Sequence, residues 1–540
     1  MAEQKEMKSL WSVIVFGALV TTCLLLILAL GNCAASQVRS RRTTTGANEI
    51  TVGAGGDLQA AITAAKFGDT IILQAGATYT GPLMLPNKGA GKGSDADYIT
   101  IRTSDLAGIA KEGNRISSTQ APAMPKIVSP SKESTISTQP QAHHYKFIGI
   151  EFSPAEDADY VYNLIDLGAS NYNSLSQFPH HLVFDRCYVH STGLNKVRRG
   201  FALNSAETSV INSYVSGFAG DGDETQAIAG WNGPGPFHIV NNYLEGGAEV
   251  LLFGGADPSI SNLVPSDIEI RRNYFRKPAE WQGHATIKGT LELKNARRVI
   301  IDGNLLESEI RVTAFVITVR NQNGKAPWST IEDVNITNNI VRHASTGINI
   351  LGSDNEHISQ QAQRISVANN LLTDLVSDDP SNSAYFLQVN GGDSITVEHN
   401  TVQQAGNVVS GYGTPTTNFV FRNNIVQFNL YGAVCFTPAP QCPRENLFCG
   451  CFPGGVFKGN IFADNKGTAA SEGTDKKYPP GNFFVSSYDK LGFVDYISGN
   501  WQLGASGGHR GRATDGKDPG VNTDALKAAG AEKARLGSGF

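Results

Sequence analysis

A short pattern that ends in asparagine recurs along the middle of the chain. An alternating apolar triplet is followed by polar residues, then by Asn and one more residue, as in IEIRRNY at 268–274 and VIIDGNL at 299–305. The final Asn of the pattern falls at positions 242, 273, 304, 339, 370, 400, 424 and 460. A recurrence of this length is typical of repeat architectures, in which each unit buries its apolar side chains against its neighbours.

The local pattern indicates which kind of repeat this is. Apolar residues alternate with a period of two inside each triplet, as in strands with one buried face, and the 3.6-residue spacing of a helical repeat is not seen. A coil of three short strands needs roughly 20 to 30 residues, which fits the repeat once loops are added. The sequence therefore predicts an all-β parallel β-helix. Because Asn tolerates left-handed backbone and its side chain can bond neighbouring backbone, we expect the repeated Asn to stack as a ladder at one corner.

The ends of the repeat region can also be assigned. Residues 57–65 read as a short amphipathic helix with Asp57 near its N-cap, and a strand begins at GDTIIL, residues 68–73. A helix is the expected cover for the open end of a solenoid, so we expect an N-terminal capping helix. We assign 37–48 as a linker, 49–465 as the β-helix, and 466–540, which lacks the repeat, as a C-terminal cap and irregular tail.

Composition agrees with this fold and excludes one class of partner. The chain has 58 glycines and only 17% charged residues, which favours short strands and turns. Its 540 residues exceed the size at which a single compact core stops growing, a limit that a solenoid avoids. The net charge of −5 gives no sign of a nucleic-acid-binding surface.

The first 36 residues are separate from the fold. The stretch from Leu10 to Leu30 is almost wholly apolar, with Lys5 and Lys8 before it and Cys33 after it. This run is long for a signal-peptide core and just long enough to span a bilayer. A cleaved signal peptide, a retained anchor at residues 10–30 and a lipid anchor on Cys33 all remain open. Each predicts an exported protein, whether secreted, periplasmic or at the cell surface.

Four cysteines cluster in one loop. In an exported protein such a cluster favours two disulfides, although a small zinc site is the competing interpretation. No histidine lies nearby, and the spacing fits no familiar zinc motif. The four are Cys435, Cys442, Cys449 and Cys451.

One outer face of the coils is predicted to carry a column of polar side chains. In IKGTLELK, residues 287–294, alternation places Ile287, Leu291 and Leu293 inward. The opposite parity, which should point outward, contains Lys288, Thr290, Glu292 and Lys294. One coil later, Arg320 should point outward from FVITVR, residues 315–320.

Adjacent coils add acids and amides to this column. Glu249 and Asp257 precede it, and Asn349 and Gln388 follow it. Trp281 and Trp328 flank it in loops, where aromatic rings could stack on sugars or simply cover a coil edge. Repeat proteins also align charged surface residues without any function. As a functional hypothesis, the substrate-binding residues are Lys288, Asn321, Asn349, Gln388, Trp281 and Trp328.

The helix followed by GDTI and the Asn-ending coils resemble the pectate-lyase-like superfamily of right-handed parallel β-helix proteins, over roughly residues 49–465. The resemblance implies the fold strongly and the function weakly, because the superfamily contains lyases, hydrolases, epimerases, adhesins and phage tailspikes.

The polar column suits β-elimination of a uronate polymer. A base must take the proton next to the carboxylate, and a cation must stabilise the developing charge. Lys294 as base and Arg320 as its partner match this need. Glu249, Asp257 and Glu292 could hold Ca²⁺, which would neutralise the uronate carboxylate.

The segment from Glu292 to Asn304, followed by 319–324, is similar to a pattern of the chondroitinase B and alginate lyase family. That family has a Lys-Ser step before a strand ending in Asn, and an Arg-His-Gly stretch one coil later. The resemblance again implies Lys294 as base and Arg320 as partner. This chain has Asn295 in place of the Ser and Asn321-Gln322 in place of His-Gly, and the family's paired calcium glutamates are not matched before Lys294.

The sequence therefore predicts an exported protein that acts on a polysaccharide, with a lyase of uronate-containing glycans as the first hypothesis. A non-catalytic protein that binds glycan or builds the cell envelope is the alternative from another class. A glycoside hydrolase or epimerase on the same fold is a further alternative. A polygalacturonase-type set of carboxylates is not found within the coils. DGDE at 221–224 could be a calcium loop or simply an acidic turn.

Overall fold

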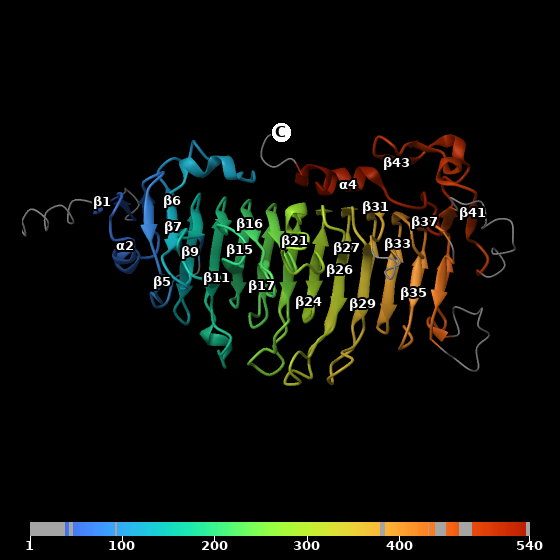
Figure 1. Ribbon diagram of the computed structural model, residues 1–540, viewed down its shortest axis with the longest axis horizontal. Coiled ribbons are helices and arrows are strands. Elements are labelled where there is room, and N and C mark those ends of the chain that lie inside the picture. The colour runs from blue at the N-terminus through green and yellow to red at the C-terminus, as the bar shows by residue number, and fades with distance from the viewer. Residues whose placement is uncertain are drawn as a thin grey trace, which may run out of the picture.

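The computed structural model describes residues 38–42, 47–91, 94–378, 384–429, 431–437, 450–463 and 478–535. The protein is an elongated solenoid whose coils follow one another along its long axis from the N-terminal to the C-terminal end (Figure 1). Three long sheets run the length of the coils, and nearly all of their strand pairs are parallel. This confirms the predicted all-β parallel β-helix.

Each coil contributes one strand to each sheet. Sheet A contains β1 (Val38–Arg42), β2 (Asn48–Val52), β3 (Thr70–Leu73), β6 (Ile99–Thr103), β9 (His143–Ile148), β12 (His180–Asp185), β15 (Thr208–Ile211), β18 (Phe237–Val240), β21 (Ser266–Arg271), β24 (Ala296–Asp302), β27 (Ile331–Thr337), β30 (Gln363–Ala368), β33 (Asp393–Glu398), β36 (Val420–Arg422) and β39 (Val456–Lys458). In this sheet β1 and β2 are antiparallel.

Sheet B contains β4 (Thr78–Thr80), β7 (Lys126–Ser129), β10 (Glu151–Pro154), β13 (Tyr188–His190), β16 (Tyr214–Phe218), β19 (Tyr243–Gly246), β22 (Tyr274–Arg276), β25 (Leu305–Glu307), β28 (Ile340–Arg342), β31 (Leu371–Leu375), β34 (Thr401–Gln404), β37 (Ile425–Gln427), β40 (Ile461–Ala463) and β41 (Phe483–Val485). Since β41 pairs with β40, the parallel sheets extend past residue 465.

Sheet C contains β5 (Leu83–Leu85), β8 (Ile136–Thr138), β11 (Val161–Leu167), β14 (Val197–Leu203), β17 (Gln226–Gly230), β20 (Leu251–Phe253), β23 (Leu291–Leu293), β26 (Thr313–Thr318), β29 (Thr346–Leu351), β32 (Leu387–Asn390), β35 (Val409–Gly411) and β38 (Ala433–Cys435). Short elements outside the three sheets are α2 (Leu58–Ala64), α4 (Thr523–Ala529), β42 (Phe493–Asp495), β43 (Asn500–Leu503), η1 (Asp95–Asp97), η2 (Ser118–Ala123), η3 (Leu175–Gln177), η4 (Ala279–Trp281), η6 (Tyr488–Leu491), η7 (Ala505–Gly507) and η8 (Glu532–Arg535).

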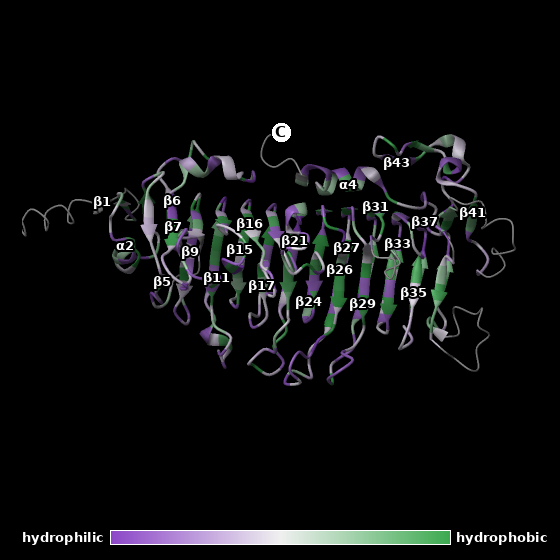
Figure 2. Ribbon diagram, in the orientation of Figure 1, coloured by the Kyte–Doolittle hydropathy of each residue, from purple (hydrophilic) through white to green (hydrophobic). Residues whose placement is uncertain are grey.

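The core is the stack of inward side chains from all three sheets. Hydrophobic residues follow the strands, whereas hydrophilic residues gather in the loops (Figure 2). In register between neighbouring coils, Phe147 of β9 stacks on Phe184 of β12 with ring centroids 5.0 Å apart, and both are fully buried. Such contacts repeat from coil to coil, so each coil covers the apolar edge of the next.

The predicted asparagine ladder is present. The backbone N–H of Asn242 donates to Oδ1 of Asn273 at 2.9 Å, and equivalent bonds continue along the coils as far as Asn460 and Asn482, at 3.1 Å. The structure corrects one detail, because the left-handed residue is the one before each ladder Asn, for example Asn241 with φ 58°. The ladder Asn therefore supplies hydrogen bonds rather than the bend itself.

The predicted N-terminal helix is α2, at the N-terminal end of the solenoid (Figure 1). Asp57 caps it, since its Oδ1 accepts from the N–H of Ala60 at 2.8 Å. Leu58, Ala61 and Ile62 are buried, and the helix contacts β2 and β5. The helix thus packs its apolar face onto the first coils.

The C-terminal segment, residues 486–535, runs back along the outside of sheet B (Figure 1). Its Trp501 and Leu526 pack with the outward residues Leu305 and Ile340, which are almost fully buried as a result. At its far end Arg115 donates from Nη1 to the carbonyl of Ala534 at 2.6 Å. The segment is a folded strap, which we name the C-terminal strap, rather than an irregular tail.

One disulfide joins Cys435 and Cys451. The other two cysteines of the predicted cluster, Cys442 and Cys449, lie outside the described residues. The first 36 residues, for which export was predicted, also lie outside them. Cys187 is buried and free, and burial raises the pKa of its thiol to about 12. Within the described ranges, no helix is both long enough and apolar enough to cross a bilayer.

Candidate active site on sheet C

A continuous row of hydrogen-bonded polar side chains crosses six consecutive coils of sheet C. It begins on β11 and ends on β26, and most of its members are largely buried. We name it the polar row, and it consists of Asn163, Arg199, Gln226, Glu249, Glu292 and Thr318.

The N-terminal half of the polar row is centred on Arg199. Its Nε donates to Oε1 of Gln226 at 3.0 Å, and its Nη1 donates to Oδ1 of Asn163 at 3.4 Å. The guanidinium also lies over the rings of Tyr162 and Trp231, with centroid distances of 5.1 and 5.0 Å. A cation between two aromatic faces is held in one place, and here it is fixed beside an amide chain that leads to the carboxylates.

A carboxyl group with a raised pKa lies near this half of the row. Asp166 follows Asn163 on β11, and burial raises the pKa of its carboxyl to about 6, while the hydrogen bond from Asn163 and the charge of Arg199 act in the opposite direction. The raised pKa places its titration close to neutral pH.

The centre of the row is a pair of glutamates. Gln226 Nε2 donates to Oε2 of Glu249 at 2.8 Å, and Thr318 Oγ1 donates to Oε1 of Glu292 at 3.1 Å. The two carboxyl groups are electrostatic neighbours, since Glu249 contributes to the raised pKa of Glu292. Burial raises the pKa of Glu292 to about 7; Lys294 opposes this rise and Glu249 adds to it. Because two neighbouring ionised carboxylates repel each other, the pair needs a shared proton or a cation.

Lys294 supplies a positive charge beside this pair. It follows β23, and its Nζ lies 3.6 Å from Oε2 of Glu292. The glycine at 254 permits this placement: its φ is +100°, and a Cβ there would lie 2.8 Å from Cβ of Lys294 and 2.7 Å from the backbone N of Asn295. Only glycine lets the two coils approach this closely.

Arg320 is the backbone neighbour of Lys294 on the next coil. Its N–H donates to the carbonyl of Lys294 at 2.9 Å. Its guanidinium, however, is directed to the following coil, where Nη1 pairs with Oδ1 of Asp354 at 3.3 Å and also bonds Asn355. The two predicted catalytic residues are thus adjacent along the backbone, but the side chain of Arg320 has carboxylate and amide partners of its own.

Lys288 lies at the exposed edge of the site, paired with Glu224. Glu224, Glu249 and Glu292 together raise the pKa of Lys288, against the lowering effect of its partial burial. Within DGDE, Glu224 is thus engaged with Lys288, while Asp223 adds to the rise that burial causes in the pKa of the Tyr160 hydroxyl. These separate partners favour an acidic turn over a calcium loop.

Asn349 and Gln388 continue the outer face. Cα register places Glu292 beside Val316, Val316 beside Asn349, and Asn349 beside Gln388. Both amides are half-buried, and the buried Oδ1 of Asn349 accepts no hydrogen bond from the part of the chain that the structure describes. They lie two and three coils beyond Glu292, and their role as substrate contacts stays a prediction.

Two predicted binding residues instead build the loop at 321–326. Oδ2 of Asp257 accepts from the N–H groups of Asn323 and Lys325 at 2.9 and 3.0 Å. Asn321 is 1% exposed, its Nδ2 donates to the carbonyl of Ile358, and its Oδ1 accepts from the N–H of Ala326. Asn321 as a substrate contact is therefore corrected to a loop-ordering residue. Asp257 orders the same loop, but its buried Oδ1 accepts no hydrogen bond from the described residues, so its role as a metal ligand stays a prediction.

The tryptophan predictions also change. Trp281 is buried in a side cluster with Ala219, Ile310 and Val312, so its ring offers no open face to a sugar. Trp328 is half-buried, and its indole N–H donates to the carbonyl of Leu263 at 3.0 Å. Ile287, predicted to point inward, packs against the cluster of Trp281 instead, because β23 begins only at Leu291.

Sequence analysis missed Asn163, Arg199 and Gln226. They are in register with one another and share the parity of the inward residues Ile165, Phe201 and Ile228. Asn163 and Arg199 are the third residues of β11 and β14, after the buried Val161 and Val197, so period-two alternation expects an apolar residue at their positions. Polar residues at an inward-parity position, repeated on three coils, are the signal that would have revealed them.

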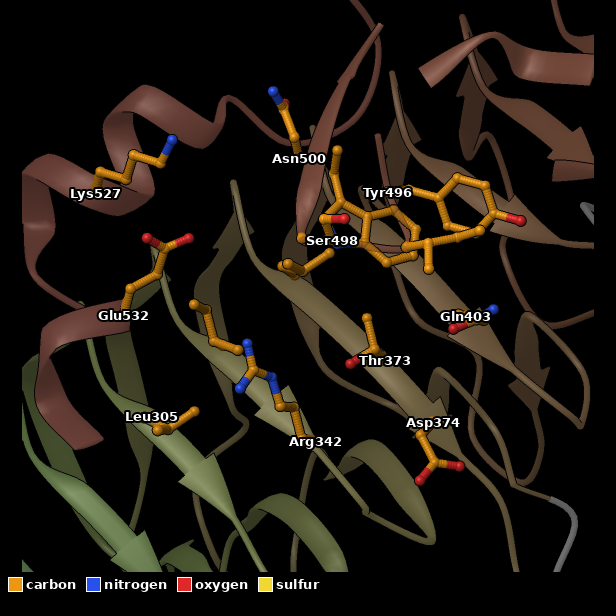
Figure 3. Close-up of a pocket in the computed structure, with 15 residues that line it drawn as sticks. Leu305, Arg342, Thr373, Asp374, Gln403, Tyr496, Ser498, Asn500, Lys527 and Glu532 are labelled. Carbon is orange, nitrogen blue, oxygen red and sulfur yellow. The ribbon is translucent and has the colours of Figure 1, made fainter. Parts of the chain in front are cut away.

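A cavity of about 790 Å³ lies elsewhere, between sheet B and the C-terminal strap. Figure 3 shows Lys527 and Glu532 on the strap, facing Arg342, Thr373 and Asp374 on the strands below. None of the predicted site residues lines it. Its charges are partly paired, since Arg342 lies 3.8 Å from Glu307 and Asp374 pairs with Arg311 and His343. We therefore place the candidate site at the polar row.

The residues at the glutamate pair fit a bound cation in part. The buried Oε1 of Glu249 receives no hydrogen bond from the described side chains, and Glu292 is its electrostatic neighbour. Two neighbouring carboxylates, with a free oxygen, are suitable oxygen ligands for Ca²⁺, which takes six to eight in all. Glu249 and Glu292 would hold such an ion.

The sequence matches no protein-family model and no curated protein. Two solved structures share its fold. One is the PL6 family alginate lyase AlyGC, with a TM-score of 0.52 and 13% identity, covering 81% of this chain and 53% of that chain. The other is a mannuronic acid specific polysaccharide family 6 lyase from human gut microbiota, with a TM-score of 0.51 and 12% identity, covering 90% of this chain and 99% of that one.

These likenesses concern the fold. The chain spans about half the length of AlyGC but nearly all of the second lyase. Together with the three parallel sheets, they confirm the right-handed parallel β-helix that the resemblance to pectate-lyase-like proteins implied.

Proposed function

We propose that this protein is an exported polysaccharide lyase that cleaves a uronate-containing glycan by β-elimination at the polar row. The observation that carries the proposal is the position of Lys294, 3.6 Å from a buried glutamate whose pKa is raised to about 7. The two solved lyases that share the fold, whose names include an alginate lyase and a mannuronic acid specific lyase, support the substrate class.

In this proposal Lys294 is the base. An ammonium must lose its proton before it can act, and a neighbouring carboxylate of high proton affinity can accept it. Glu292 has that affinity, because burial and Glu249 favour its protonated form. Neutral Lys294 then takes the proton on the carbon next to the uronate carboxylate. The carbon–carbon double bond forms as the glycosidic oxygen at the next carbon leaves with the bonding electrons and takes up a proton, from the Lys294 ammonium or from water.

The substrate carboxylate needs a positive partner while the negative charge develops. Lys288 is half-exposed at the edge of the site and can exchange Glu224 for a uronate. Arg320 would reach the substrate only by releasing Asp354, so we assign it a secondary role. With Ca²⁺ held by Glu249 and Glu292, the ion would neutralise the uronate and disfavour the ammonium form of Lys294, which would then lose its proton to water instead of to Glu292.

The test is incubation with alginate, polymannuronate, pectate and chondroitin sulfate, followed by the ultraviolet absorbance of unsaturated uronate. We expect absorbance to rise with at least one polymer, and Lys294→Ala to lower the rate by at least 100-fold. Lys146→Ala, on sheet A, is the matched control and should keep the wild-type rate. Full activity of Lys294→Ala, or no product from any polymer, would refute the proposal.

Non-catalytic glycan binding is the second candidate, favoured by Arg199 between Tyr162 and Trp231. In that case the polymers bind without forming product, and Trp231→Ala weakens binding while Lys294→Ala does not. Glycoside hydrolysis by the glutamate pair has less support. A glycoside hydrolase places its two carboxyl groups about 5 Å apart or more, on opposite sides of the scissile bond, whereas Glu249 and Glu292 are buried neighbours within one row.

A further inference from the structure

Four histidines form a compact cluster at the edge of sheet A where its strands begin, away from the polar row. His143 and His144 begin β9, and His180 and His181 begin β12 on the next coil. His143 and His180 are paired in register, so the two dipeptides lie one directly above the other. We name this group the histidine cluster.

The four rings are arranged as two stacks. His143 stacks on His180 with centroids 4.8 Å apart and planes 3° apart, and His144 stacks on His181 at 4.3 Å and 11°. Within each coil the two rings are nearly perpendicular. Perpendicular neighbours turn their Nδ1 atoms toward each other, at 2.6 Å in the first pair and 2.7 Å in the second.

The outer nitrogens of two of these rings have defined partners. Nε2 of His143 lies 2.7 Å from the carbonyl of Gly89, which can only accept, so this Nε2 carries the proton. Nε2 of His181 lies 2.7 Å from the carboxylate of Glu207 and donates in the same way. In the neutral rings the Nδ1 atoms of His143 and His181 therefore carry lone pairs that point into the cluster.

This is the arrangement that metal-binding imidazoles show. A histidine ligand almost always donates its other N–H to a carbonyl or carboxylate, which fixes the ring and its tautomer. Ligand atoms of His143, His144 and His180 all lie within 4.8 Å of one another, as do those of His180, His181 and Glu207. In a tetrahedral zinc site with Zn–N of about 2.0 Å, neighbouring nitrogens are roughly 3.3 Å apart, between the short and long separations found here.

The surroundings are also suitable. His143 and His144 are 7% and 2% exposed, and Phe67 stacks on His143 at 5.0 Å. The cluster therefore has a buried side and a partly open side at His180 and His181, through which an ion could enter. Imidazole-only ligation suits Zn²⁺, Cu²⁺ and Ni²⁺, and it does not suit Ca²⁺, which prefers oxygen.

We propose that His143, His144, His180 and His181 form a binding site for a divalent first-row transition-metal ion such as Zn²⁺. His143 and His181 present lone pairs already, while His144 and His180 join by moving their proton from Nδ1 to Nε2. No net proton is released in that exchange. The ion would join two successive coils on the side of the solenoid that carries no polar row.

The test uses the full-length protein, stripped with a chelator and titrated with Zn²⁺ by calorimetry. We expect one equivalent to bind, and the His143→Ala/His180→Ala double variant to lose at least 100-fold in affinity. His238→Gln, on β18 of the same sheet but paired with Glu269, is the matched control and should bind as wild type. Added Co²⁺ should give the visible absorbance of a tetrahedral nitrogen site in wild type and in the control.

A second variant keeps the test decisive if the double variant folds poorly. Glu207→Gln leaves all four imidazoles in place but weakens the acceptor that orients His181, so Zn²⁺ affinity should fall by about 10- to 100-fold. The proposal is overturned if the Zn²⁺ affinity of wild type is no higher than that of the double variant. It is also overturned if Glu207→Gln and the double variant both bind Zn²⁺ as tightly as wild type. The cluster would then be a stacked ladder of side chains only.

Discussion

The glutamate pair shows how one residue can carry both stability and chemistry. Glu292 is 7% exposed and lies against Glu249, so its ionisation inside the protein is opposed by lost hydration and by a like charge. The folded protein therefore holds a proton that the unfolded chain gives up at lower pH. This difference makes the folding free energy depend on pH.

We expect the free energy of unfolding to fall as pH rises from about 5 to 7.5. The pKa of Glu292 is raised from its ordinary 4.5 to about 7, so the extra stability is present below the unfolded pKa and is lost as pH passes the folded pKa. The loss should be about 2–3 kcal/mol, since each pKa unit corresponds to about 1.4 kcal/mol. Urea unfolding of wild type and Glu292→Gln at several pH values measures it. An identical pH dependence in both proteins would contradict the assignment.

Calcium belongs to the same residues. If the ion binds at Glu249 and Glu292, chelation with EGTA should abolish polymer cleavage, and added Ca²⁺ should restore it. Ca²⁺ should also raise the melting temperature of wild type but not of Glu249→Gln, because only the folded protein holds the paired carboxylates. Glu224→Gln, outside the pair, should retain the thermal shift. Cleavage that is unaffected by EGTA would exclude a calcium requirement.

At the scale of the element, the coil is the unit that sequence reveals best. The Asn ladder was predictable because one residue type recurs at one corner, and every coil repeats the same requirement. The polar row was only half predictable. Glu292 and Lys294 follow the parity of β23, but Arg199 and Gln226 lie at the inward parity of their strands, where alternation expects apolar side chains. Asp257 accepts from backbone N–H groups of a loop 66 residues away, a contact that no local sequence pattern indicates.

The close approach of two coils at Gly254 predicts the effect of a single methyl group. Gly254→Ala places a Cβ 2.7 Å from the backbone N of Asn295 at a φ of +100°, so the coil must shift and move Lys294 with it. We expect a loss of about 2–4 kcal/mol in the free energy of unfolding and at least a tenfold loss of activity. Gly283→Ala is the control, with a φ of +76° but nothing within 4 Å of the added carbon. Its cost should be only about 1 kcal/mol. Equal effects of the two variants would contradict this account.

At the scale of the whole molecule, the C-terminal strap covers a row of apolar side chains on the outer face of sheet B. Tyr274, Leu305 and Ile340 face outward from the coils, yet the strap leaves them less than 10% exposed. Sequence analysis did not predict this, because the strap has no repeat of its own and its contacts are far away in sequence. The bond from Arg115 to Ala534 spans 419 residues.

Removing the strap should leave the coils folded but expose that apolar face. A chain ending at residue 486 should keep its β-rich circular dichroism, bind a hydrophobic dye strongly and self-associate, because a contiguous apolar patch becomes solvent-exposed. Its melting temperature should fall by several degrees. A truncated protein that stays monomeric and binds no dye would show that the outer face of sheet B does not need its cover.

The Asn ladder also has a consequence for how such a chain can change length. Hydrogen bonds between ladder asparagines stay near 2.9–3.1 Å, although the sequence separation of successive corners varies from 22 to 36 residues. Each ladder asparagine thus fixes the position of one corner, whereas the length and course of the chain between corners can vary. Excising 340–370, one full turn of the spiral, would bring Asn339 against Asn400, the same residue type it meets now. Whole turns of the solenoid can therefore be inserted or deleted, and each such change alters the length of the surface that it can present to a long polymer.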